Sequence, residues 1–275
     1  MSSSDALQSA TLRAFAEQTR SILLTEDRVR LLWLTGSLAA GTSDAQSDVD
    51  LRLAVREEDF ATVGQWWQDL IDLVAPTVWK RRWPGPPSEA ILGAITTDYL
   101  RFDLVVQSVT DTQPRRLEAA QLIFDKDGIA EHFALTSATP SDPFANLPVL
   151  VEEFIRLLGM LPIVVERNDV PMGMEGQLAL HSLFISVLLL ENGIDRATTG
   201  KRHVVAYLTA EQRSILAQVP TLAPTMESVI EGRLAYGRLF LPRARRLMEA
   251  QGQAYPEAFE ITTKRHVWET LGLSL

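Results

Sequence analysis

The residues best suited to chemistry are two aspartates that follow a glycine–serine turn and stand in an apolar run. Residues 36–51 read Gly-Ser-Leu-Ala-Ala-Gly-Thr-Ser-Asp-Ala-Gln-Ser-Asp-Val-Asp-Leu, and the apolar run continues to residue 55. Because side chains alternate along a strand, Asp48 and Asp50 lie on one face, roughly 6.5–7 Å apart along the backbone. Both carboxylates can then reach one hard cation, which prefers oxygen ligands. This spacing predicts a metal site for nucleotidyl transfer.

The apolar residues of this run are expected to face the hydrophobic core, on the side of the strand opposite the acids. They alternate with the acids and fall on the opposite face of the strand. They are Val49, Leu51, Leu53 and Val55. We expect this face to pack against helices while the acidic face stays open.

A third carboxylate is needed if two cations, about 3.5–4 Å apart, are to support the attacking and leaving oxygens of a phosphoryl centre. Asp103 is the candidate, because alternation puts it on one face with Arg101 and Tyr99. A carboxylate within a hydrophobic strand is costly unless it is paired or metal-bound. The competing interpretation is an Asp103 that faces solvent or pairs with an arginine. The presence of Asp48 and Asp50 favours the metal.

The first half of the chain predicts the strands and helices that position these acids. Amphipathic helices are expected over residues 5–24 and 59–74, the second capped by Asp59 and ended by Pro76. The pattern indicates a mixed sheet, with a hairpin near residues 96–98. Its strands are expected over residues 29–35, 49–55, 77–83, 90–97, 99–109 and 122–124.

The second half has only helical patterns, and a proline-rich segment, residues 140–148, is the best linker candidate. The expected fold is therefore α/β, in the α+β arrangement. A mixed-sheet domain would cover residues 1–140, and an α-helical bundle would cover residues 148–275. The helices are expected over residues 150–161, 175–191, 201–219, 224–250 and 256–271.

Composition limits the function. The 275 residues include no cysteine, which excludes disulfides and thiol chemistry and fits a reducing cytoplasm. A formal charge of -9 argues against broad binding to nucleic acid and would steer a small cation favourably. Residues 1–20 lack the pattern of a secretory signal. The longest apolar stretch, residues 182–190, is far shorter than the roughly 20 residues of a membrane span, so no membrane is expected.

Residues 29–109 resemble the DNA polymerase β-type nucleotidyltransferase superfamily. The motif is specific because a turn, a fixed gap, two alternating acids and a third acid on a later strand must coincide. The residues that carry the resemblance are Gly36-Ser37, Gly41, Ser47-Asp48-Val49-Asp50-Leu51 and Arg101-Phe102-Asp103-Leu104.

The resemblance implies roles for these residues. Gly36 and Ser37 would hold the phosphates of a nucleoside triphosphate, and Asp48, Asp50 and Asp103 would hold two Mg²⁺ ions. Many members carry arginine where this chain has Ala40. A basic contact to the triphosphate would then come from Arg52, Arg101 or a residue of the helical half.

A single such domain followed by helices resembles the antibiotic nucleotidyltransferases, which transfer AMP from ATP to a hydroxyl of an aminoglycoside or lincosamide. This implies that residues 1–140 form the nucleotidyltransferase domain and that the helical bundle of residues 148–275 binds the substrate. It also implies a cleft between the domains and an acid that accepts the hydroxyl proton. Asp103, Glu89 and Glu175 compete for that role. For Glu175 the alternative is stabilisation of a helix start by the macrodipole. For Glu89 the alternative is a solvated acid in a loop just before a strand pair.

Two other functions stay open. The acceptor could be a protein, as in regulatory adenylylation or a toxin–antitoxin system, or the chain could be a catalytically silent nucleotide-binding module. The three acids speak against the silent module, because a pure binder has no need of two metals. The sequence leaves open the acceptor hydroxyl, the nucleotide preference and the oligomeric state.

Overall fold

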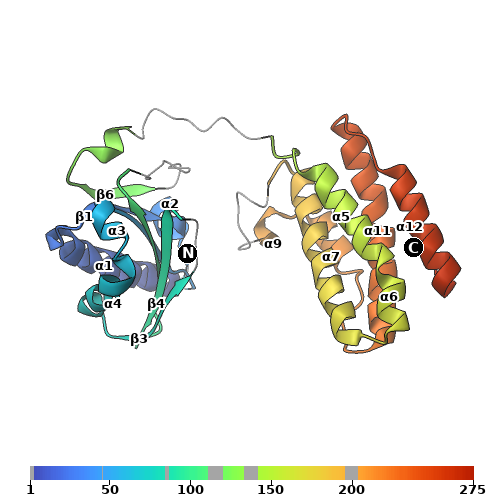
Figure 1. Ribbon diagram of the computed structural model, residues 1–275, viewed down its shortest axis with the longest axis horizontal. Helices are drawn as coiled ribbons and strands as arrows, with labels where there is room; N and C mark the ends of the chain where they lie inside the picture. The colour runs from blue at the N-terminus through green and yellow to red at the C-terminus, as the bar shows by residue number, and fades with distance from the viewer. Residues whose placement is uncertain (1–2, 45, 84–86, 111–119, 133–141, 196–203) are drawn as a thin grey trace. The chain divides into compact units, whose positions relative to one another are not determined.

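The computed structural model describes residues 3–44, 46–83, 87–110, 120–132, 142–195 and 204–275. The chain divides into two compact units, Met1–Thr139 and Pro140–Leu275. Figure 1 shows a sheet with helices in the first unit and helices in the second. The predicted combination of a mixed sheet with a helical half is confirmed.

The described residues of the first unit form one six-stranded sheet with the order β3-β4-β5-β2-β1-β6. Strands β2 and β5 pair in parallel, and the other neighbours pair antiparallel, so the sheet is mixed. The parallel pair requires a crossover, and β3 and β4 lie within that connection. The strands are β1 (Val29–Thr35), β2 (Val49–Val55), β3 (Thr77–Trp83), β4 (Glu89–Thr96), β5 (Arg101–Ser108) and β6 (Gln121–Asp125).

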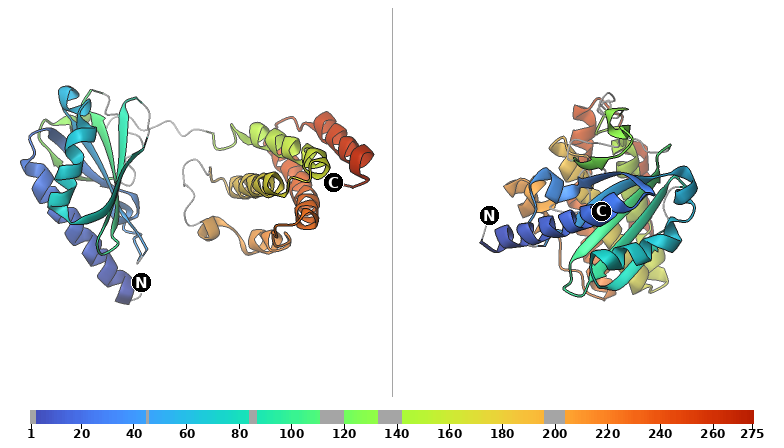
Figure 2. Two further views of the ribbon diagram at one scale, coloured as in Figure 1. Left: turned by 60° about the horizontal axis from the view of Figure 1, so that its bottom comes forward. Right: turned by 90° about the vertical axis from the view of Figure 1, so that its left-hand side faces the viewer.

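Helices α1 (Ser3–Thr25) and α4 (Val63–Val74) cover one face of the sheet (Figure 2). Leu12 of α1 and Trp67 of α4 are fully buried in the same core as the apolar residues of β2. The alternation predicted for β2 is confirmed, because its four apolar residues on this face are all buried. Asp50, which lies between Val49 and Leu51, therefore points to the other face.

Two local predictions in this unit are corrected. The expected helix over residues 59–74 is two helices, α3 (Glu57–Phe60) and α4, so Asp59 lies inside α3 and does not cap α4. Glu57, Glu58 and Asp59 form the first turn of α3, where acids favour the helix N-terminus. The turn at Gly36 continues as a short helix, α2 (Gly36–Ala40).

The second unit packs its helices around α7 (Val170–Glu191) and α11 (Met226–Ala250). The rings of Phe154 and Phe240 stack with centroids 3.5 Å apart, and Phe184 meets Phe240 edge to face. Figure 1 shows α5, α7 and α11 side by side. The other helices are α5 (Leu147–Gly159), α6 (Leu161–Glu166), α9 (Val204–Tyr207), α10 (Ala210–Leu216) and α12 (Glu257–Leu271).

The helix expected over residues 201–219 lies partly outside the described residues. Its described part is not one helix, because Thr209 caps α10 in a capping box with Gln212 and separates it from α9. Helix α6 was not expected from the sequence; it begins after Met160, with Pro162 in its first turn. Within the described residues, α7 alone has the length and hydropathy of a membrane span, by composition only, and half of that window is buried in the unit.

Candidate metal centre

Gly36 brings the end of β1 close to the acids. Its φ of +68° lies in the left-handed region, and a Cβ at this position would lie 2.0 Å from Asp50 Oδ2. Thr35 is the register partner of Asp50, so the turn begins directly beside that carboxylate. Only glycine satisfies both the backbone conformation and the close approach.

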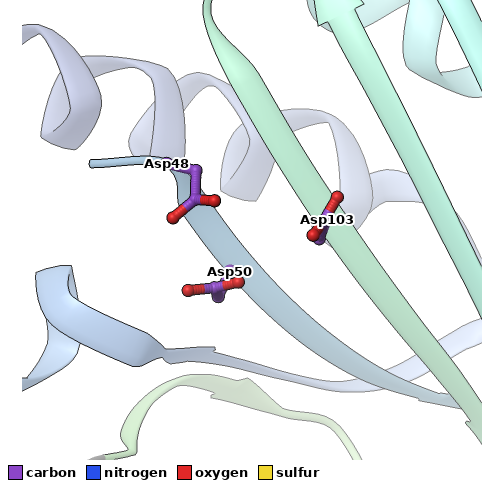
Figure 3. A group of neighbouring side chains, drawn as sticks. All are labelled: Asp48, Asp50 and Asp103. Atoms are coloured by element: carbon purple, nitrogen blue, oxygen red, sulfur yellow. The ribbon is translucent and has the colours of Figure 1, made fainter. Parts of the chain in front are cut away.

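The three aspartates predicted from the sequence lie together (Figure 3). Asp48 immediately precedes β2, Asp50 is in β2, and the parallel pairing makes Asp103 of β5 the direct partner of Asp50. One carboxylate oxygen from each lies within 4.8 Å of the others. Asp48 is 3% exposed, and the other two are half-buried. We call this group the acidic triad.

The acidic triad suits a hard divalent cation. Three carboxylates at this spacing repel one another unless a cation or proton compensates their charge. Magnesium holds its oxygen ligands at about 2.0–2.1 Å, so ligands on opposite sides of one ion are about 4.2 Å apart. Oxygens that already lie within 4.8 Å of one another therefore need only small side-chain adjustments to share an ion.

Ser37 follows Gly36 in α2 and is half-buried. Thr35 occupies the N-cap of α2 but makes no side-chain cap, and the amide of Thr42 donates to the Ser37 carbonyl at 2.9 Å. The backbone amides of Gly36 and Ser37 belong to a turn that begins next to Asp50, because Thr35 is the register partner of Asp50. Oriented amides of this kind suit phosphate oxygens.

The arginines proposed as substitutes for the basic residue missing at Ala40 have other partners. Arg101 is exposed, and its guanidinium donates to the Gln46 carbonyl at 2.5 Å. Arg52 lies 4.0 Å from Glu89. A phosphate contact by either arginine would compete with these interactions.

Glu89 is not a solvated loop acid, as its position in the sequence indicated. It is the first residue of β4, its side chain is 8% exposed, and it accepts a hydrogen bond from Gln107 Nε2 at 3.0 Å. Gln107 stands four residues beyond Asp103 on β5, about 13 Å away at 3.3 Å per residue. Glu89 is therefore too far along the sheet to act beside the acidic triad.

Glu175 belongs to the second unit and is exposed in the second turn of α7. The expected helix start at Glu175 is wrong, because α7 begins at Val170. Asp169 is its N-cap and accepts a hydrogen bond from the Met172 amide at 3.0 Å, and Pro171 lies in the first turn. Asp169 thus stabilises the helix start, and a catalytic role for Glu175 stays a prediction.

The sequence prediction missed Trp83 and Gly93, which lie beside Asp103. A Cβ built at Gly93 would lie 2.5 Å from two atoms of the Trp83 indole and 3.0 Å from Asp103 Oδ1. A glycine within an otherwise apolar strand was the available signal, because it often marks a close approach. The strand order that brings β3 and β4 to the acidic triad could not be read from the pattern.

No family model and no curated protein matches the chain. Among solved structures, the chain is similar to an aminoglycoside 6-adenyltransferase from Bacillus subtilis, with 14% identity and a TM-score of 0.39 over 93% of this chain and 95% of that one. It is also similar to CdnC of E. coli MS115-1 with ATP, with 15% identity and a TM-score of 0.29 over 96% and 92% of the two chains. Similarities at this level do not assign the chain to a family.

Proposed function

We propose that this protein is a magnesium-dependent nucleotidyltransferase that transfers AMP from ATP to a hydroxyl of a small molecule. The observation that supports the proposal is the acidic triad. Three carboxylates from two adjacent parallel strands converge within 4.8 Å on one face of the sheet, beside the Gly36 turn.

In this proposal Asp48, Asp50 and Asp103 hold two Mg²⁺ ions, and the amides at Gly36 and Ser37 orient the triphosphate. Bound magnesium would supply Lewis-acid stabilisation of the charge that develops at the phosphoryl centre. The acceptor oxygen attacks the α-phosphorus in line. The new P–O bond forms as the bond to the β-phosphate oxygen breaks and pyrophosphate leaves.

The hydroxyl proton needs an acceptor, and Asp103 is the acid of the first unit that we propose for it. It is half-buried and stands at the edge of the acidic triad, toward β4. Glu175 remains the competing candidate from the second unit. A base must come within hydrogen-bond reach of the hydroxyl, so the two candidates predict different variants to be inactive.

A small-molecule acceptor is supported by the negative charge of the chain, which gives no broad basic surface for nucleic acid. Aminoglycosides and lincosamides are the acceptors that the sequence resemblance suggests. A protein acceptor is the second possibility. Both share the same donor chemistry, so one labelling experiment separates them.

The experiment is transfer of label from ATP labelled at the α-phosphate, with Mg²⁺, to a panel of small hydroxyl compounds and to a cell extract. We expect Asp50→Asn to lower transfer by at least about a hundredfold, because it removes a metal ligand. Asp98→Asn is the matched control, since Asp98 is an exposed acid of the same unit that lies outside the acidic triad. Near-normal transfer by Asp50→Asn would refute the assignment.

A further inference from the structure

Strand β3 carries two tryptophans and an arginine on the face of the sheet that holds the acidic triad. The register across β3, β4 and β5 pairs Arg81 with Gly93 and Gly93 with Asp103. Directly paired residues share a face of a sheet. Trp79 and Trp83 stand two residues on either side of Arg81, so they share this face too. We call Trp79, Arg81 and Trp83 the edge patch.

The edge patch reaches the acidic triad across Gly93. The Trp83 indole lies over this glycine, because two indole atoms are 2.5 Å from the point that a Gly93 Cβ would occupy. Asp103 Oδ1 is 3.0 Å from the same point. No side chain at Gly93 separates the indole from the carboxylate. The part of a bound molecule that extends beyond the Trp83 ring would therefore lie next to Asp103.

The aromatic part of the edge patch is broad and accessible. The rings of Trp79 and Trp83 have centroids 5.5 Å apart at an interplanar angle of 58°, and Trp79 is 39% exposed. Ile95 and Ile91, both half-buried, pair with Trp79 and Trp83 and extend the apolar surface. An exposed indole, Trp79, and a half-buried one, Trp83, next to the acidic triad form a surface on which a flat ring can stack.

The charged part of the edge patch is a cation that is available for a ligand. Arg81 is exposed, and its guanidinium lies 5.7 Å from the centre of the Trp83 ring. Among the residues that the structure describes, no carboxylate is ion-paired with Arg81. Its neighbour Lys80, on the other face, does pair with Asp72 at 2.5 Å. A guanidinium beside an indole suits a phosphate or carboxylate, to which it can donate two parallel hydrogen bonds.

We propose that the edge patch binds the acceptor of the transfer reaction, and that this acceptor is a ring-bearing hydroxyl compound with an anionic group, such as a phosphate monoester. This inference rests on the proposed function. Its ring stacks on Trp83, its anion binds Arg81, and its hydroxyl reaches the acidic triad beside Asp103. A polycationic acceptor fits less well, because Arg81 would repel it at short distance. The negative charges elsewhere on the chain are farther away, and salt screens their attraction.

The kinetic test uses labelled ATP and five acceptors. They are a ribonucleoside monophosphate, a sugar phosphate, the dephosphorylated form of each, and an aminoglycoside as the cationic compound. We expect label on a phosphorylated ring and at least about a tenfold rise in the acceptor KM for Trp83→Ala, with the KM for ATP unchanged. Arg81→Gln should raise the acceptor KM only for the phosphorylated compounds. Transfer of label to the aminoglycoside that stays the same in Trp83→Ala and Arg81→Gln would overturn the inference.

Arg82→Gln is the matched control for Arg81→Gln. Arg82 is the next residue of the same strand, but it pairs with buried Leu92 and its guanidinium lies against Gly64 of α4, on the helix-covered face. We expect the acceptor KM of Arg82→Gln to stay at the wild-type value. An equal rise for both arginine variants would mean that β3 is merely perturbed, and would also overturn the inference.

A binding experiment separates this inference from the proposed function. Quenching of tryptophan fluorescence is measured in Asp50→Asn without ATP, so that binding is read without transfer, on adding the ribonucleoside monophosphate or the sugar phosphate. Quenching that is lost in Asp50→Asn/Trp83→Ala and weakened in Asp50→Asn/Arg81→Gln supports the edge patch even if no transfer is found. Absence of quenching by both phosphates refutes it even if transfer to another compound is found.

Discussion

Gly36 is required both by its backbone conformation and by its closeness to the acidic triad. Its positive φ disfavours a side chain, and a Cβ at this position would lie only 2.0 Å from Asp50 Oδ2. We expect Gly36→Ala to displace Asp50 and to lower nucleotidyl transfer by at least about a hundredfold. The measurement is transfer of α-phosphate label, with circular dichroism to confirm that the sheet is retained.

Gly41 provides the control for this substitution. It also has a positive φ, +71°, but a Cβ there would meet nothing within 4 Å. Gly41→Ala should therefore cost about 1–2 kcal/mol of backbone strain and keep its activity. Equal losses of transfer in the two variants would show that strain in the turn, and not the contact with Asp50, is responsible.

Single residues of the acidic triad could be predicted because their signal is local. The alternation of acids with apolar residues in β2 and β5 needs no knowledge of the rest of the chain, and it placed Asp48, Asp50 and Asp103 on the face opposite α1 and α4. The contact of Trp83 with Gly93 depends on the order of three strands, which the alternation within each strand does not specify. Glu89 was misjudged for the same reason, because its partner Gln107 is on another strand.

At the scale of the element, helix α7 carries two acids with different expected roles: Asp169 stabilises the helix, and Glu175 is a candidate proton acceptor. Asp169 caps the helix, and we expect Asp169→Ala to lower the free energy of unfolding of the second unit by about 1 kcal/mol. Exposed Glu175 makes no cap, so Glu175→Ala should change it by less than about 0.5 kcal/mol. Chemical denaturation of both variants checks this. Lost transfer in Glu175→Ala at unchanged stability would assign the proton acceptor to Glu175 and not to Asp103.

Helix α11 holds a second element-scale feature, a buried cation without an ionic partner among the described residues. Arg233 is 2% exposed, donates to the Leu157 carbonyl, and leaves its Nε without a hydrogen bond. Burial lowers the pKa of Arg233 to about 10, so it is still charged at neutral pH. We expect Arg233→Met to raise the free energy of unfolding by on the order of 1 kcal/mol at pH 7, because a buried charge without an ionic partner among the described residues is replaced by an unbranched apolar side chain.

The pH dependence of this gain has a definite sign. A cation whose pKa is lower in the folded than in the unfolded state destabilises the fold fully below the folded pKa, and the penalty fades as the pH rises through it. The advantage of Arg233→Met should thus be constant up to about pH 9 and shrink above pH 10. Arg238→Met, at an exposed position of the same helix, is the control and should show no such advantage. A destabilised Arg233→Met would mean that the bond to Leu157 outweighs the buried charge.

The strands and helices were predicted well where a single sequence pattern runs through the whole element. The prediction was less accurate where a helix is interrupted. Strands β1, β2 and β3 have the expected bounds, because turn-forming residues mark at least one end of each run. The break between α3 and α4 depends on backbone hydrogen bonds around Thr62, which accepts from the Gln65 amide at 2.8 Å. Such bonds follow from packing against the sheet, so periodicity over residues 59–74 could not reveal the break.

At the scale of the whole molecule, each unit has a core of its own. The first buries α1 and α4 against the sheet, and the second buries α5, α7 and α11 against one another. A chain of residues 1–139 has the size of an ordinary domain and contains the complete acidic triad. We expect this fragment to fold alone and to unfold cooperatively, and likewise the fragment of residues 140–275.

Ligand binding to these two fragments tests where the nucleotide is held. A ligand at a hundred times its Kd stabilises the folded state by about 2.7 kcal/mol, which should raise the Tm of fragment 1–139 by several degrees with ATP and Mg²⁺ together. ATP with EDTA should raise it less, and Asp50→Asn should lose the magnesium-dependent part, since that part requires the acidic triad. Fragment 140–275 is the control and should not respond. A magnesium-dependent Tm shift in fragment 140–275 alone would place the triphosphate outside the sheet and remove the role assigned to Gly36 and Ser37.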